Sequence, residues 1–207
     1  MFETCIKQLI HNLQKPLPGY NAQRTMAPPQ RLPAEEYDLH TLKAKNACAL
    51  VLLYPNNNKV CIPLLLRSVY NGIHSAQISL PGGKPEISDT SLVATALRET
   101  QEEIGVDPQR ITVIGSLTPL YIPPSNFLLH PFVGYMNEHP LFEIDPKEVQ
   151  RVYEITLDEF KDAQNRKKKL IYHQSIKSEL ITPYYAIQEQ TIWGATAMVL
   201  SELLTLI

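Results

Sequence analysis

The sequence predicts an α+β sandwich in which several strands are combined with one internal helix and one C-terminal helix. Two observations predict it: strand-like runs recur along most of the 207 residues, and helical periodicity is confined to a few segments. The 17 prolines separate these segments, because proline fixes φ and cannot donate a hydrogen bond to a helix or a sheet ladder. The sequence contains no internal repeat and no low-complexity tract.

The N-terminal segment is predicted to be a short helix followed by an extended arm. Apolar residues recur at helical spacing within residues 2–14, which indicates an amphipathic helix packed against the main body or a partner. Five prolines then fall within an 18-residue stretch, namely Pro16, Pro18, Pro28, Pro29 and Pro33. We therefore expect residues 1–40 to form a helix and proline-rich arm, and residues 41–207 to form the main domain.

The main domain begins with a predicted hairpin and ends with a predicted helix. Strand-like Ala47–Tyr54 and Val60–Arg67 flank a Pro-Asn-Asn-Asn turn at residues 55–58. Glu86–Asp107 lacks proline and is long enough to contain the internal helix. Further strands are predicted at Ile111–Leu117, Leu128–Tyr135, Val149–Leu157, Leu170–Ile176 and Leu180–Ile187. The closing helix is predicted over Ile192–Leu206.

Composition excludes several classes of protein. The hydrophobic content of 44% and charged content of 19% are typical of a globular chain, and the longest apolar run is too short to span a membrane. The net charge of -2 provides no overall field for nucleic acid or an anionic membrane. The three cysteines lack C-x-x-C spacing, and the N-terminus lacks the pattern of a signal peptide. We therefore expect a cytoplasmic protein that binds neither nucleic acid nor membrane.

The internal helix carries an acidic face. Glu99, Glu102 and Glu103 stand at i, i+3 and i+4, and therefore share one side of a helix. A second stripe, about 130° around the helix, is predicted to face the core and comprises Val93, Leu97, Thr100 and Ile104. Carboxylate oxygens at this density suit a hard cation such as Mg²⁺ or Mn²⁺, and Arg98 can hold a glutamate through a bidentate pair. The alternative is an ordinary solvated helix face.

A glycine loop precedes this helix and favours the metal site over the alternative. Pro81-Gly82-Gly83-Lys84 follows a strand-like segment, and two adjacent glycines let a backbone group approach a ligand closely. The string from Gly82 to Val106, which includes Arg98-Glu99-Thr100-Gln101-Glu102-Glu103-Ile104-Gly105, resembles the Nudix box. It departs from the box in two respects. First, Asp89 stands where the box has a glutamate, and the eight residues between Asp89 and Arg98 are one more than in the box. Second, Thr100 stands where the box has an aliphatic residue.

The longer spacing between Asp89 and Arg98 resembles that in the branch of the Nudix family that acts on coenzyme A. Strings outside the box also resemble this branch: Leu64–Ser68, His74–Gly83, Met26–Arg31, Glu148–Val149 and Ile192–Ala197. The resemblance implies an α/β/α sandwich with a mixed sheet and an internal catalytic helix. It also implies cleavage of the diphosphate of coenzyme A or acyl-coenzyme A to adenosine 3′,5′-bisphosphate and 4′-phosphopantetheine.

The resemblance further implies which residues form the site. Mg²⁺ or Mn²⁺ would be held by Glu99, Glu102, Glu103 and the carbonyl of Gly82, with Arg98 as a supporting catalytic residue. Glu148 is a candidate supplementary ligand or base. The alternatives are that a glutamate of the box is the base and that Glu148 is an ordinary solvated residue at the start of a strand. Substrate-binding candidates are Gly83 and Lys84, together with Arg67, which lies at a strand end and could contact a phosphate in a bidentate manner.

Several alternatives remain open at this point. The substrate could be ADP-ribose, NADH or a dinucleoside polyphosphate, and a non-catalytic nucleotide-sensing module on the same fold is a different class of function. The sequence does not decide between a monomer and a homodimer. Features expected to be structural are His74, His130, His173, the core anchor Trp193 and an exposed lysine-rich hairpin turn at Lys167–Lys169. The loop Pro119–Phe127 is expected to shape a substrate pocket.

Overall fold

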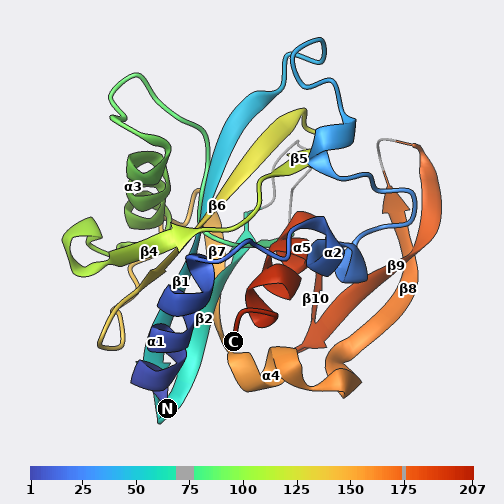
Figure 1. The fold of residues 1–207 in the computed structure, drawn as a ribbon. Helices are drawn as coiled ribbons and strands as arrows, with labels where there is room; N and C mark the ends of the chain where they lie inside the picture. The colour runs from blue at the N-terminus through green and yellow to red at the C-terminus, as the bar shows by residue number, and fades with distance from the viewer. Residues whose placement is uncertain (69–76, 174–175) are drawn as a thin grey trace.

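Two sheets form the framework of the protein in this computed structural model, which describes residues 1–68, 77–173 and 176–207 (Figure 1). In the described residues the larger sheet has the order β3-β2-β1-β6-β4, with β5 paired to β6 and β7 to β2, and the smaller has the order β10-β9-β8. The strands of the larger sheet are β1 Lys45–Asn56, β2 Lys59–Arg67, β3 Ile78–Ser79, β4 Thr112–Ser116, β5 Leu120–Ile122, β6 Phe127–Tyr135 and β7 Val149–Thr156. Those of the smaller sheet are β8 Arg166–His173, β9 Ser178–Ile187 and β10 Gln190–Trp193.

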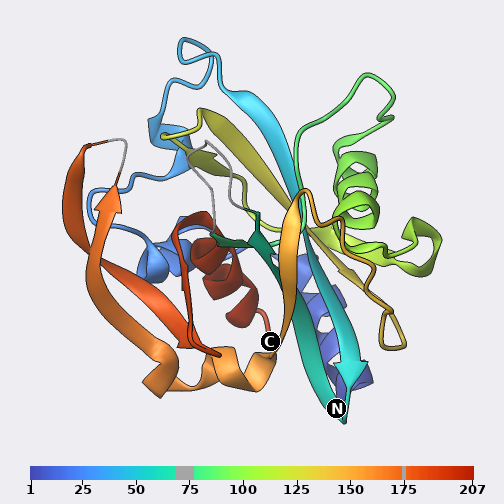
Figure 2. The ribbon, with the colours of Figure 1, turned by 180° about the vertical axis from the view of Figure 1, so that it is seen from behind.

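Helices cover both faces of the larger sheet, with α3 on one face and α1 and α5 on the other (Figures 1 and 2). The helices are α1 Phe2–Leu13, α2 Tyr20–Gln23, α3 Leu92–Ile104, α4 Leu157–Lys161 and α5 Gly194–Leu204. The sheet is mixed, because β1 runs parallel to β6 and antiparallel to β2. The predicted α/β/α sandwich with a mixed sheet is therefore confirmed.

Strand β1 explains why the core has two layers. Its central residues are fully buried and alternate between the two faces, as the pleat of a strand requires. Cys48, Leu50 and Leu52 belong to the hydrophobic cluster beneath α3, whereas Val51 and Leu53 belong to the cluster beneath α1 and α5. A continuous apolar run is typical of a strand that is covered on both sides.

The local sequence signals account for the hairpin and for the ends of α3. Asn57 and Asn58 have positive φ values of 49° and 63°, which the turn between β1 and β2 requires. Ser91 caps α3 by accepting a hydrogen bond from the amide of Ala94 at 3.1 Å, and Gly105 ends the helix in the left-handed region with φ of 72°. The helix is therefore shorter than the proline-free window that predicted it.

The structure corrects three expectations about secondary structure. Trp193 lies in β10 and not in the closing helix, because it pairs with Tyr184 of β9 before the chain turns at Gly194 with φ of 64°. The run Lys167–Lys169 lies within β8 rather than in a hairpin turn. The strand predicted at Leu170–Ile176 extends over Arg166–His173 in the described residues. Periodicity alone does not separate a short strand from the first turn of a helix.

The arm is not uniformly extended, because it contains α2 and short 3₁₀ turns, and parts of it enter the core. Cys5, Ile6 and Leu9 of α1 and Met26 of the arm belong to the same buried cluster as α5. The division of the chain at residue 40 stays a prediction. No helix in the described part of the chain combines the length and apolar character needed to cross a bilayer.

Candidate active site

The glycine loop is held against β1 by backbone hydrogen bonds. The amide of Leu50 donates to the carbonyl of Pro81 at 2.9 Å, and the amide of Cys48 donates to the carbonyl of Gly83 at 2.8 Å. A Cβ atom at Gly82 would lie 2.1 Å from the carbonyl oxygen of Cys48, and the φ of 151° is also unfavourable for other residues. The first glycine therefore permits the close contact between the loop and the strand.

The second glycine leaves room for a carboxylate. A Cβ atom at Gly83 would lie 2.3 Å from the carboxylate carbon of Glu99. The Glu99 side chain therefore lies directly against the backbone of the loop. Burial raises the pKa of Glu99, Arg98 lowers it, and the charges of Glu102 and Glu148 raise it further.

Glu103 is fully buried between the loop and β2. Its carboxylate accepts a hydrogen bond from the amide of Gly82 at 2.8 Å and forms an ion pair with Arg67 at 3.0 Å. Burial raises the pKa of Glu103 to about 7, although Arg67 and the Gly82 amide act in the opposite direction. The charges of Glu99 and Glu148 also raise the pKa of Glu103. Glu148 therefore lies within electrostatic reach of both Glu99 and Glu103.

The expected acidic face is not one uniformly solvated surface. The exposed fraction of the side chain is 56% for Glu102, 15% for Glu99 and 1% for Glu103. The core-facing side of α3 is displaced from the predicted stripe. Thr100 and Ile104 are buried as expected, but Val93 and Leu97 are only partly buried, and Thr95 and Ala96 are fully buried instead. The three carboxylates therefore differ in their access to solvent, although they share one side of the helix.

Arg98 connects the helix to the loop that precedes it. Its Nε and Nη2 atoms donate to the two carboxylate oxygens of Asp89, each at 3.0 Å, and its Nη1 donates to Glu102 at 2.7 Å. The bidentate partner is therefore Asp89, which corrects the expectation that a glutamate takes this position. The guanidinium holds the pKa of Asp89 well below its usual range. Nη2 also donates to the carbonyl of Lys84 at 2.9 Å.

The predicted substrate-binding residues lie at the edge of the same site. Arg67, Gly83 and Lys84 all line one cavity with a volume of about 410 Å³. The Nζ atom of Lys84 lies 5.3 Å from the ring centroid of Phe127, a cation–π contact. Arg67 is held by Glu103 at the end of β2, so its guanidinium is positioned between the helix and the cavity.

The carboxylate chemistry of the site fits a hard divalent cation. Glu99, Glu103 and Glu148 offer oxygen atoms alone, and their mutual repulsion is the kind of charge excess that such a cation relieves. In the described residues, no three acidic, histidine or cysteine side chains converge in a metal-binding geometry. Arg67 forms an ion pair with Glu103, and Arg98 forms one with Glu99.

The cavity extends beyond the predicted site toward the N-terminal arm and the second sheet. Arg31 of the arm, Phe127 of β6, and Tyr172 and Trp193 of the smaller sheet contribute to its wall. The part of the predicted loop that contains Ile122, Pro124 and Ser125 also lines the cavity. Sequence reasoning did not assign Arg31. The signal that could have found it is an arginine two residues after the Pro28-Pro29 pair, in the string Met26–Arg31 that resembles the coenzyme A branch.

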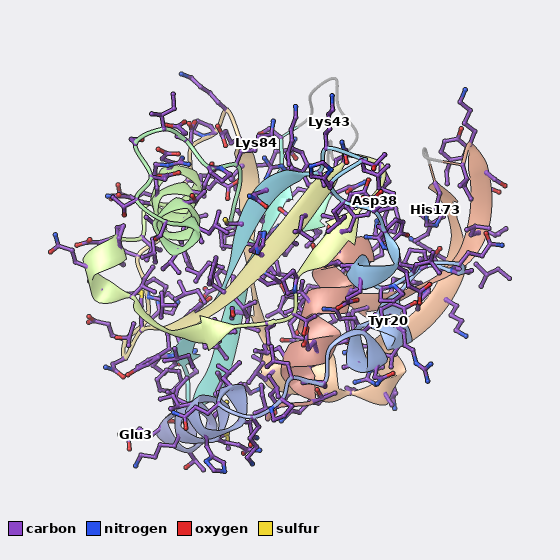
Figure 3. All side chains as sticks on the ribbon, turned by 45° about the horizontal axis from the view of Figure 1, so that its top comes forward. Glu3, Tyr20, Asp38, Lys43, Lys84 and His173 are labelled. Carbon is purple, nitrogen blue, oxygen red and sulfur yellow. The ribbon has the colours of Figure 1, made fainter. Side chains whose placement is uncertain are left out.

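The histidines behave mostly as expected. His130 pairs with the amide oxygen of Asn46 at 3.0 Å, and His173 pairs with the hydroxyl of Thr182 at 2.7 Å. His173 also contacts the ring of Trp193 and lines the cavity. Figure 3 shows this residue on the hairpin formed by β8 and β9. The prediction for His74 lies outside the described residues.

Comparison with known proteins shows the family and agrees with the fold. The model of the NUDIX domain family matches residues 44–174, which include the glycine loop and α3. The chain is 32% identical over 149 residues to "Uncharacterized Nudix hydrolase NudL" of Photorhabdus laumondii, an alignment that covers 70% of this chain and 76% of that protein. It is also 32% identical over 169 residues to the protein of that name in Yersinia pestis, covering 79% and 81% of the two chains.

A solved structure, that of the Nudix hydrolase RenU from M. smegmatis, aligns with a TM-score of 0.48 and 17% identity, covering 57% of this chain and 74% of that one. The family model and the relatives named Nudix hydrolase define a hydrolase that acts on acid anhydrides. The chain belongs to the NUDIX domain family, because the family model spans more than half of its length.

Proposed function

We propose that this Nudix hydrolase cleaves the diphosphate of coenzyme A or an acyl-coenzyme A. The observation that supports the proposal most strongly is the composition of the cavity. Arg31, Arg67 and Trp193 belong to three strings that are distant in sequence and each resemble the coenzyme A branch, and all three residues line the cavity beside the glycine loop. A volume of about 410 Å³ is within the range of ligand-binding pockets.

The reaction requires charge neutralisation and an aligned water. A diphosphate resists attack because its oxygen atoms repel a nucleophile. Mg²⁺ or Mn²⁺, when bound, would neutralise this charge and lower the pKa of a water molecule. Glu99, Glu102, Glu103 and the carbonyl of Gly82 are the proposed ligands, and the proposed products are adenosine 3′,5′-bisphosphate and 4′-phosphopantetheine.

The remaining residues have positioning and binding roles in this proposal. Arg98 holds Glu102 and Glu99 through hydrogen bonds or ion pairs, so the carboxylates start from restrained positions. Arg67 and Lys84, at the cavity wall, provide positive charge for the substrate diphosphate. The base is either Glu148, which is exposed at the start of β7, or one of the helix glutamates.

A substrate panel tests the proposal. The purified protein is assayed with Mg²⁺ and with Mn²⁺ against coenzyme A, acetyl-coenzyme A, ADP-ribose, NADH and a dinucleoside polyphosphate. We expect kcat/KM to be highest for coenzyme A or its acyl derivative, with products identified by mass spectrometry. A higher value for ADP-ribose would contradict the coenzyme A assignment and leave the hydrolase class intact. Binding without turnover of any compound would favour the nucleotide-sensing alternative.

A cytoplasmic location is part of the proposal. All three cysteines are unpaired and buried, which agrees with a reducing compartment. The proposed partner is therefore a small nucleotide substrate of the cell interior. Size-exclusion chromatography with light scattering would distinguish a monomer from a homodimer.

A further inference from the structure

Arg31 of the arm is a partly buried cation that has no counter-ion among the described residues. One of its Nη atoms donates to the carbonyl of Tyr121, and its own carbonyl accepts from the hydroxyl of Tyr20. Its Nε atom is buried and has no hydrogen-bond partner in the described structure. No carboxylate of the described residues forms a salt bridge with it. Buried donors are almost always satisfied, so the guanidinium keeps unused hydrogen-bonding capacity in the wall of the cavity that it lines.

The environment of Arg31 favours an anionic partner. Burial lowers the pKa of the guanidinium, and the nearby hydroxyls of Tyr37, Tyr20 and Tyr121 offset this only in part. The pKa of His173 is lowered by its own burial and, in addition, by the charge of Arg31, so the two side chains are near each other. Desolvated positive charge is costly unless an opposite charge compensates it. An arginine fork matches the oxygens of a phosphate group.

The cavity connects Arg31 with the glycine loop. Gly82, Gly83 and Lys84 line one part of it, and Arg31 lines another part together with the aromatic residues Tyr172 and Trp193. Figure 3 shows Lys84 beside the larger sheet and His173 on the hairpin of the smaller sheet, so the residues of the cavity wall come from both sheets. A ligand whose diphosphate lies at the glycine loop can therefore place a second anionic group at Arg31.

We propose that Arg31 binds a phosphate monoester of the substrate that is separate from the diphosphate that is cleaved. The ligand class is a nucleotide that carries both groups, with its base against the aromatic wall. This inference rests on the proposed function and deepens it, because it makes an arm residue responsible for selecting the phosphorylated nucleoside. Arg31 is then a specificity residue and takes no part in the chemical step.

Binding of two nucleotides tests the proposal without requiring turnover. Isothermal titration calorimetry is performed with adenosine 3′,5′-bisphosphate and with AMP, which lacks the second phosphate, on the wild-type protein and on Arg31→Gln. Because charged hydrogen bonds contribute about 1.5–3 kcal/mol, we expect the substitution to weaken bisphosphate binding about 10- to 100-fold. AMP binding should change less than about twofold. Equal affinity of the wild-type protein for the two nucleotides would overturn the proposal.

Kinetics provide a second test with coenzyme A and 3′-dephospho-coenzyme A. Arg31→Gln should reduce the ratio of the two kcat/KM values about 10- to 100-fold, mainly through KM for coenzyme A. This ratio is insensitive to partial unfolding, which matters because Arg31 also contacts Tyr121. Arg31→Lys keeps the charge and should retain part of the preference. Equal losses for both substrates would show a structural role only and would overturn the proposal.

A matched control separates a specific effect from a loss of surface charge. Arg110 forms an exposed ion pair with Glu138 and does not line the cavity, so Arg110→Gln should leave both the affinities and the ratio unchanged. Failure of the proposed function has a different signature. In that case coenzyme A is not hydrolysed, yet calorimetry still reports whether Arg31 selects the bisphosphate.

Discussion

Glu102 and Glu103 are adjacent in sequence, but their side chains lie in different environments. Glu103 is fully buried and bound by Arg67 and the amide of Gly82, whereas Glu102 is more than half exposed and contacts Arg98. A carboxylate held on two sides is suited to a fixed position in the site. An exposed carboxylate costs little to change, so its substitution tests catalysis with little effect on folding.

The first prediction concerns Glu102. Glu102→Gln should reduce Mg²⁺- or Mn²⁺-dependent kcat/KM by about a hundredfold or more, because it removes a proposed metal ligand. The free energy of unfolding should change by less than about 1 kcal/mol, as measured by urea denaturation. Glu3→Gln is the matched control, since Figure 3 shows Glu3 far from Lys84, and it should leave kcat/KM unchanged. Full activity of Glu102→Gln would contradict the role of this residue.

The two adjacent glycines should respond differently to alanine. At Gly82 the new Cβ would meet the backbone of Cys48 in a φ region that alanine avoids, so Gly82→Ala should destabilise the protein by about 3 kcal/mol or more. At Gly83 the Cβ would meet the end of the flexible Glu99 side chain. Gly83→Ala should therefore keep the fold and lose activity. Thermal denaturation and kcat/KM distinguish the two outcomes, and similar melting temperatures for both variants would contradict the prediction.

At the scale of elements, α3 and the loop before it form one unit. Asp89 accepts hydrogen bonds from Arg98, from the hydroxyl of Thr95 at 2.9 Å and from the amide of Glu86 at 2.8 Å. Asp89 therefore ties the loop to the first half of the helix, although it departs from the Nudix box. The longer spacing before Arg98 is thus compatible with a structured connection.

A substitution at Asp89 tests this connection. Asp89→Asn removes a charge that pairs with Arg98, so the melting temperature and kcat should both fall. Hydrogen exchange should show faster opening of residues 85–95 than in the wild-type protein. Asp107→Asn is the control, because Asp107 caps a short 3₁₀ turn beyond the helix. Unchanged exchange in Asp89→Asn would show that the loop is held by other contacts.

At the scale of the whole molecule, one buried carboxylate contributes several of the hydrogen bonds that tie the arm to the domain. Glu202 of α5 is fully buried and accepts hydrogen bonds from Gln23 at 2.8 Å, from the amide of Gly19 at 3.1 Å and from the hydroxyl of Thr118 at 2.6 Å. These partners come from the arm and from the segment between β4 and β5. We therefore expect the position of the arm, which carries Arg31, to depend on packing at the opposite end of the sequence.

Removal of this carboxylate should affect both stability and substrate binding. Glu202→Ala leaves several buried donors without a partner, so we expect the free energy of unfolding to fall by about 3 kcal/mol. KM for coenzyme A should rise, because the arm that carries Arg31 loses its anchor. Denaturant titration and steady-state kinetics measure the two effects, with the exposed Glu138→Ala as control. An unchanged KM would show that Arg31 is positioned independently of Glu202.

Much of the fold could be predicted because its signals are local. The apolar run in β1 and the asparagine turn each depend on neighbouring residues, so the sequence indicates them directly. Trp193 shows the limit of such reasoning. A four-residue strand next to a helix has too few residues for its period to be recognised, and only pairing with β9 defines it.

The sequence by itself determined the mixed α+β architecture, the glycine loop and the helix with its glutamates and arginine. Only the tertiary structure decided that Glu103 is buried, that Arg98 pairs with Asp89 and that Arg31 reaches the cavity. The physical reason is that burial and electrostatic partners depend on distances between residues that are remote in the chain. Those distances follow from strand register and helix packing, whereas a sequence pattern reports only the periodicity of its own segment.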